Sequence, residues 1–302
     1  MASEEQRKND PTRKPSPRKP HRFSKGGWKE MLVNFKNSIS KDHVSIIAAG
    51  VAFYVLLGII PALAAAISIY GLIADPHDIE EHFSAMEGVM PQEANQILQE
   101  QMSRIADEQS PAGWGALIGI VLALWAGSRG TKATMEALNI TYKEQETRGF
   151  LKLPAVALAL TFTLVLLGLL AVAIIVFLPP LIGNLPLPAI AEKALAIGMW
   201  PLLLLIGILG ITLLYRFGPS RRQPKWKWLT WGSVTATLLW LIASALFSFY
   251  VANFGSYNKT YGSLGAIVVL LLWFWVSAFV ILVGAELDAA LEQQTEKDVL
   301  PE

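Results

Sequence analysis

The chain contains no cysteine, which excludes disulfide bonds and thiolate metal sites. It has four histidines among 302 residues, and two of them, His77 and His82, stand five positions apart. A metal-binding pair on one helical face is usually spaced by four residues, so this pair does not predict a zinc site. Clustered carboxylates, a nucleophile elbow and a glycine-rich phosphate loop are also missing. The sequence therefore predicts no catalytic residues, no metal and no cofactor.

Charged residues are scarce within the apolar parts of the chain. Six long apolar stretches occur, and none has Asp, Glu, Lys or Arg deep inside it. Proton pumps usually place ionisable groups at that depth, so a buried-carboxylate pump is not expected. The six stretches are 44–73, 113–128, 153–181, 197–215, 229–252 and 263–287.

All but the second of these stretches clearly reach the roughly 20 residues that span the hydrocarbon core of a bilayer. A hydrophobic fraction of 53% and a mean hydropathy of +0.43 agree with that class of protein. We therefore predict an all-α polytopic membrane protein with six transmembrane helices.

The distribution of Lys and Arg predicts the orientation. Residues 1–41 contain eleven of the 25 cations, whereas the loop 74–112 has nine acidic residues and a single cation, Arg104. The loop 182–196 has only Lys193. Because cations concentrate in cytoplasmic segments, both termini are predicted to be cytoplasmic and these two loops periplasmic.

The segments outside the spans differ in composition. Residues 1–26 are rich in Lys, Arg, Pro and Ser and are predicted to be a disordered cytoplasmic tail. Within 27–41, the apolar residues fall on one helical face, which predicts an amphipathic helix in the cytoplasmic interface. That face consists of Trp28, Leu32, Phe35 and Ile39. A six-helix membrane domain at 42–292 and a cytoplasmic tail at 293–302 complete the predicted organisation.

Residues 76–109 predict a periplasmic amphipathic helical hairpin between the first and second spans. Asp75 is a helix cap followed by proline, and Gly88 and Pro91 separate two apolar stripes. Because the surrounding surface is acidic, the hairpin is expected to pack over the membrane domain.

Gly58 and Pro61 lie near the middle of the first span and predict a helix break. Transporters use such breaks to build binding sites, but ordinary kinked helices contain the same residues. Both interpretations stay open.

Charged and polar residues gather at the predicted cytoplasmic ends of the spans. They are interfacial pairs and snorkelling side chains, or they form a substrate pocket for an anionic head group. Arg129 is expected to pair with Glu286 or Asp42. The full candidate set is Arg129, Glu286, Asp42, Glu136, Asn139, Tyr215 and Arg216. On the periplasmic side, an aromatic cluster of Tyr250, Tyr257 and Tyr261 is typical of membrane anchors.

Several motifs resemble those of the YihY/BrkB family of bacterial inner-membrane proteins, over about residues 30–292. In the first span the similar residues are Asp42, Ala48-Ala49-Gly50-Val51-Ala52-Phe53-Tyr54 and Pro61. Later ones are Leu124-Trp125-Ala126-Gly127-Ser128-Arg129, Asn139, Tyr142, Tyr257, Tyr261-Gly262-Ser263-Leu264-Gly265, Leu272-Trp273 and Gly284-Ala285-Glu286-Leu287. The resemblance implies a multi-pass inner-membrane protein with six spans. The family once carried the label ribonuclease BN, and some members are tied to envelope traits.

Three functions are compatible with these features. The first is a transporter or exporter of a small solute or an anionic lipid, and the alternative is a non-transporting scaffold for envelope assembly. A membrane-bound enzyme, including a ribonuclease, comes third because the cytoplasmic acids lack metal-ligand spacing. The expected partner is the lipid bilayer, including anionic head groups, and not nucleic acid; an oligomer stays open, and the sequence names no protein partner.

Overall fold

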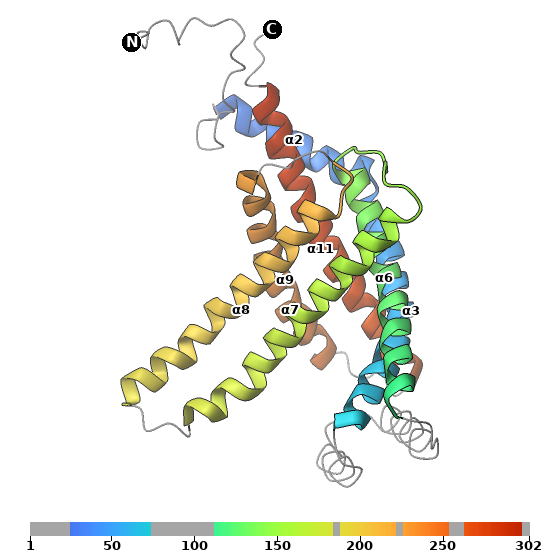
Figure 1. Ribbon diagram of the computed structural model, residues 1–302. Coiled ribbons are helices and arrows are strands. Elements are labelled where there is room, and N and C mark those ends of the chain that lie inside the picture. Colours follow the sequence, from blue (N-terminus) through green and yellow to red (C-terminus); the bar gives the residue numbers. More distant parts are fainter. Residues whose placement is uncertain (1–24, 74–111, 184–187, 222–225, 254–262, 298–302) are drawn as a thin grey trace, which may run out of the picture.

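The computed structural model describes residues 25–73, 112–183, 188–221, 226–253 and 263–297. Within these residues the chain forms seven α-helices and no strand, as the apolar periodicity predicts (Figure 1). The helices are α2 (Lys25–Lys41), α3 (Val44–Ile73), α6 (Ala112–Thr141), α7 (Lys152–Gly183), α8 (Ala189–Phe217), α9 (Trp226–Asn253) and α11 (Ser263–Lys297).

Four helical segments in this part of the chain are long and apolar enough to cross a membrane. They are Lys152–Gly183, Ile190–Phe217, Trp231–Val251 and Ile267–Gln294. A fifth exists if α2 and the first part of α3 count as one bent span. The count of six stays a prediction, and the hairpin 76–109 lies outside the described residues.

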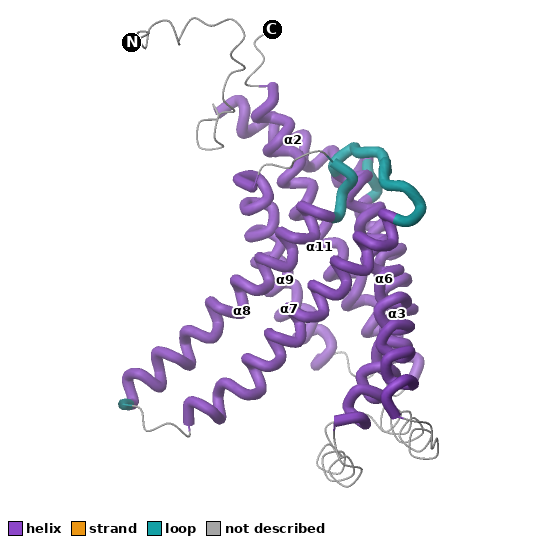
Figure 2. Tube along the Cα trace, in the orientation of Figure 1, coloured by secondary structure: helices purple, strands orange, loops and turns teal. Residues whose placement is uncertain are grey.

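Helices α2 and α3 meet at a corner of 54°. His43 forms this corner with a φ of 48°, in the left-handed region that few residues other than glycine adopt. Helix α2 therefore leaves the direction of α3 and crosses the C-terminal part of α11 (Figure 1). We call this end of the molecule the α2 end. The longest described non-helical segment, 142–151, joins α6 to α7 at the same end (Figure 2).

The apolar stripe expected on α2 is divided between two surroundings. Met31 and Phe35 pack against the end of α11, where Ala290 and Leu291 are buried. Trp28 and Leu32, by contrast, are 41% and 54% exposed. Helix α11 therefore covers a face of α2 next to the predicted stripe, and the interfacial placement of Trp28 and Leu32 stays a prediction.

Helix α3 continues without interruption from Val44 to Ile73, so Gly58 and Pro61 do not divide it into two helices. Gly58 instead lies against α6, where an added Cβ would come 3.1 Å from the carbonyl oxygen of Ala126. Gly130 of α6 lies similarly close to Val55: a Cβ added at Gly130 would come 3.2 Å from the Val55 Cα. Small residues let the backbones of α3 and α6 approach closely, as is common between membrane helices.

A second close approach joins α9 to α11. A Cβ added at Gly232 would come 2.7 Å from the Gly284 carbonyl oxygen, and one at Gly284 would come 2.5 Å from the Cβ of Ala236. Helix α11 also contacts α2, α3 and α6, and thus lies between the α3–α6 pair and α9.

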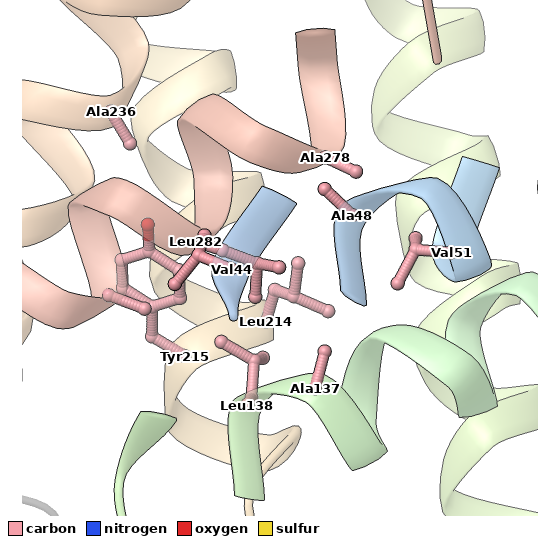
Figure 3. Packing of buried hydrophobic residues seen from close by; sticks show 11 residues of the cluster. Val44, Ala48, Val51, Ala137, Leu138, Leu214, Tyr215, Ala236, Ala278 and Leu282 are labelled. Carbon is pink, nitrogen blue, oxygen red and sulfur yellow. The ribbon is translucent and has the colours of Figure 1, made fainter. Parts of the chain in front are cut away.

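The main hydrophobic core lies at the α2 end, where five helices converge (Figure 3). Tyr215 of α8, Leu138 of α6 and Leu282 of α11 are its largest members with almost no exposed surface. The other members are Val44, Ala48, Val51, Ala137, Leu214, Ala236, Ala278 and Ala285. Helices α7 and α8 run side by side away from this core (Figure 1). Many of their described residues are exposed.

Candidate functional site

Polar side chains surround the core at the α2 end. They come from α6, α8 and α11 and from the connections between helices. We call this group the polar cluster: Asp42, Asn139, Thr141, Tyr142, Glu146, Arg148, Tyr215, Ser220, Arg221, Glu286, Asp288 and Glu292.

Asn139, in the last turn of α6, ties two connections together. Its Nδ2 donates to Oε2 of Glu146 at 2.9 Å, and its Oδ1 accepts from the backbone N–H of Ser220 at 2.7 Å. The Ser220 hydroxyl lies 2.8 Å from that of Thr147. Asn139 is 5% exposed, so both bonds are shielded from water. The end of α6 thereby positions the segments that follow α6 and α8.

Arg148 binds the C-terminal end of α8. Its two terminal nitrogens donate to the carbonyl oxygens of Phe217 at 3.2 Å and Gly218 at 2.6 Å. A cation suits this position, because the last carbonyls of a helix are unsatisfied and carry partial negative charge. Its Nε lies 3.1 Å from Oε1 of Glu146.

The environment of Glu146 lowers its pKa. Partial burial raises the pKa, but the backbone N–H of Arg148, the amide of Asn139 and the Arg148 charge outweigh that effect. Glu146 is therefore an ionised hydrogen-bond acceptor at neutral pH.

Tyr142 and Arg221 form a second group. The Tyr142 hydroxyl donates to Oδ2 of Asp288 at 3.1 Å, and the Arg221 guanidinium lies 3.9 Å from the centre of the Tyr142 ring. Arg221 also pairs with Glu292 at 2.7 Å. Burial raises the pKa of Tyr142 well above its usual value, so its hydroxyl keeps the proton that it donates. Tyr215 packs edge-on against Tyr142 and donates to the Ile281 carbonyl of α11.

Glu286 is the most enclosed acid near the α2–α3 corner, with 2% of its surface exposed. Its carboxyl group lies close to Thr141 and to the carboxyl group of Asp42. Oε1 of Glu286 and Oδ2 of Asp42 are buried and have no hydrogen-bond partner among the described residues.

The structure brings together some of the residues that the sequence singles out. Asp42 contacts Glu286, while Asn139 and Tyr215 lie at the same end of the molecule. Arg216 is half-buried, with its guanidinium 5.5 Å from the Phe217 ring centre. Tyr250, in the last turn of α9, packs against Phe247. Tyr257 and Tyr261 lie outside the described residues.

The expected pairing of Arg129 is wrong. The ion pairs among described residues join Arg148 to Glu146 and Arg221 to Glu292, and none involves Arg129. Thr141, which contacts Glu286, is twelve residues beyond Arg129 in the same helix, or about 18 Å at 1.5 Å per residue. Arg129 and Glu136 are instead exposed on α6. The pairing was expected because these residues stand near the predicted cytoplasmic ends of the spans, but α6 continues for twelve residues beyond Arg129.

Asp288, Arg221 and Glu146 were not predicted as site residues. Asp288 follows Glu286 by two positions at the end of an apolar run, which was an available signal. Arg221 and Glu146 lie in connecting segments, where charge patterns report topology and give no indication of tertiary contacts. Chemically, the polar cluster combines buried acids with two guanidinium groups that are each paired with a glutamate. Within the described residues, no group of three His, Cys, Asp or Glu could hold a metal ion.

Comparisons with known proteins agree with this architecture. A family model described as virulence factor BrkB matches residues 36–302. The chain is 30% identical over 257 residues to the ribonuclease-like protein YfkH of Bacillus subtilis strain 168, covering 82% of this chain and 90% of YfkH. A UPF0761 membrane protein of Chlorobium luteolum is 27% identical over 255 residues, covering 84% of this chain and 58% of that relative.

A UPF0761 membrane protein of Photobacterium profundum is 23% identical over 274 residues, covering 88% of this chain and 82% of the relative. No solved structure matches the chain. The match over residues 36–302 shows that this membrane protein belongs to the virulence factor BrkB family.

Proposed function

We propose that this protein is a transporter of the bacterial inner membrane that moves a small solute or an anionic lipid. One observation carries the proposal: Asp42, Glu286 and Asp288 are enclosed between helices and have carboxyl oxygens without partners among the described residues. A buried polar atom without a partner costs about 1–3 kcal/mol. Ionisable groups inside membrane proteins usually mark substrate or ion pathways.

The unequal packing of the helices supports movement. Glycines allow α3 to pack closely on α6 and α9 on α11. Many residues of α7 and α8, by contrast, are exposed. Phe177 and Trp200, for example, are 70% and 66% exposed. Helix α7 contacts α6 through the hydrogen bond between Thr161 and Thr131. Helix α8 contacts the other helices through Tyr215, which lies in the main hydrophobic core. In this proposal, alternating access moves the α7–α8 pair relative to the two closely packed pairs.

The orientation follows the charge distribution, with both termini in the cytoplasm and the polar cluster at the cytoplasmic side of the helices. A scaffold is the second candidate, and one observation favours it. Trp28, Leu32 and Val33 leave an apolar surface exposed on α2, where a partner protein could dock.

The test uses purified protein in liposomes. Uptake of a panel of small solutes and the transbilayer movement of fluorescent phosphatidylglycerol are compared with protein-free liposomes. Glu286→Gln should reduce the rate at least tenfold, because it alters the acid pair. Glu192→Gln is the matched control, since Glu192 is exposed near the start of α8, away from the polar cluster. If no solute or lipid moves faster than without protein, the transport proposal is wrong.

A further inference from the structure

Helix α6 carries charged side chains on an exposed face. Val121, Trp125 and Ile140 are 58%, 56% and 47% exposed, and Arg129 and Glu136 are exposed with them, while Lys132 is half-buried. The spacing of these residues is three or four positions, which places them along one side of a helix. We call this face the α6 stripe: Val121, Trp125, Arg129, Lys132, Glu136 and Ile140.

The other sides of α6 are occupied by neighbouring helices. Gly130 lies against Val55 of α3, with a built Cβ 3.2 Å from the Val55 Cα. The hydroxyl groups of Thr131 and Thr161 are hydrogen-bonded at 2.7 Å, which joins α6 to α7. Met135 is buried against α7 as well. The stripe is therefore the side of α6 that faces away from the helix bundle.

The same contacts give the depth of the stripe. Thr161 lies nine residues after the start of α7, and Val55 lies eleven residues after the start of α3. At 1.5 Å per residue these positions are about 14 and 16 Å from the helix ends. Arg129 is next to Gly130 and lies at the same level. Counted from these ends, that level lies inside a hydrocarbon core of about 30 Å.

Charged side chains at such depth almost always face the protein interior or a polar partner. Arg129 faces outward, and the ion pairs among the described residues do not include it. The three charged residues of the stripe sum to one positive charge, which complements a phosphodiester. An arginine fork binds two phosphate oxygens, and Lys132 is one turn away on the same side.

We propose that the α6 stripe binds the phosphate head group of an anionic lipid that enters from the surrounding bilayer. This inference rests on the proposed transport of lipid and names the binding surface for it. Arg129 and Lys132 hold the phosphate, Glu136 accepts hydrogen bonds from the head-group hydroxyls, and acyl chains pack on Val121 and Trp125. A second copy of the chain is a poorer occupant, because a twofold contact would place arginine beside arginine.

Native mass spectrometry of the purified protein tests this directly. Phosphatidylglycerol and phosphatidylcholine are added separately, and the bound lipids are counted. Arg129→Gln should lower phosphatidylglycerol occupancy at least fivefold and leave phosphatidylcholine unchanged, while Arg129→Lys should lie between. Lys193→Gln, which removes an exposed cation from α8, should bind as the unchanged protein does. Retention of phosphatidylglycerol within twofold in Arg129→Gln overturns the proposal.

A second measurement covers the case of a poorly folded variant. Because the chain has no cysteine, Trp125→Cys introduces a unique thiol on the stripe. An environment-sensitive dye is attached to this thiol. Phosphatidylglycerol brominated on its head group should quench the dye fluorescence more than phosphatidylcholine brominated in the same way. Equal quenching, or disulfide-linked dimers in membranes, overturns the lipid site, the latter because a second copy then covers the stripe.

The two proposals fail separately. Charge-dependent lipid binding without any transbilayer movement in liposomes refutes transport and leaves the lipid site standing. The opposite result is lipid movement that Glu286→Gln slows and Arg129→Gln does not, with phosphatidylglycerol binding unchanged in Arg129→Gln. That result refutes the lipid site and leaves the transport proposal standing.

Discussion

Replacing Gly284 by alanine should weaken the crossing of α9 and α11. The added methyl group would come 2.5 Å from the Cβ of Ala236, 2.6 Å from the Tyr215 hydroxyl and 2.8 Å from the Gly232 carbonyl oxygen. Ordinary contacts begin at 3.4 Å, so each neighbour must retreat by several tenths of an ångström. Two of the three atoms belong to backbone or to a Cβ and cannot rotate away.

The expected loss is about 2 kcal/mol of unfolding free energy. Overpacking of this kind costs about 1–3 kcal/mol. Displacing the Tyr215 hydroxyl from the Ile281 carbonyl adds about 1 kcal/mol. The higher helix propensity of alanine offsets about 1 kcal/mol. The assay is reversible unfolding of the detergent-solubilised protein in sodium dodecyl sulfate, followed by tryptophan fluorescence.

Gly168→Ala in α7 is the matched control, because no atom lies within 4 Å of its built Cβ. It should be as stable as the unchanged protein or slightly more stable. Ala236→Gly combined with Gly284→Ala should recover part of the loss, since it removes one of the three contacts. If Gly284→Ala unfolds at the same denaturant concentration as Gly168→Ala, the close crossing is not a stabilising feature and the reasoning fails.

Three further predictions concern the α2 end. Asn139→Ala should destabilise the protein by about 1–3 kcal/mol and expose the 142–151 segment to protease, because the Ser220 N–H and Glu146 lose a partner; unchanged cleavage would contradict this. Because the pKa of Glu146 is lowered on folding, its stabilising effect is present above its ordinary pKa and is lost as pH falls through the lowered value. Glu146→Gln should flatten the acid side of the stability-against-pH curve, and curves of the same shape would refute it. His43→Gly should stabilise by about 1 kcal/mol by relieving a positive φ, whereas Lys36→Gly within α2 should cost a similar amount; chemical unfolding of both variants gives the sign.

Much of the architecture follows from sequence because lipid leaves few options. A chain with long uncharged apolar runs must satisfy its backbone internally, and helices do so within one segment. The all-α class could therefore be predicted. The proximity of Asp42 and Glu286 could also be anticipated, since both stand at the ends of predicted spans on the side with many cations. Family membership was visible in motifs such as Gly284-Ala285-Glu286-Leu287.

The sequence by itself determined the helical class, the membrane setting and the segments with opposite charge. Only the tertiary structure decided which face of each helix points inward, because helices that are apolar on every side carry no pattern that marks the buried one. Contacts across helices also decided depth. The hydrogen bond between Thr131 and Thr161 places Arg129 beside a residue nine positions into α7. Arg148 reaches the end of α8 across 70 residues of chain. Such contacts depend on side chains that meet only after packing, and so they leave no local trace in the sequence.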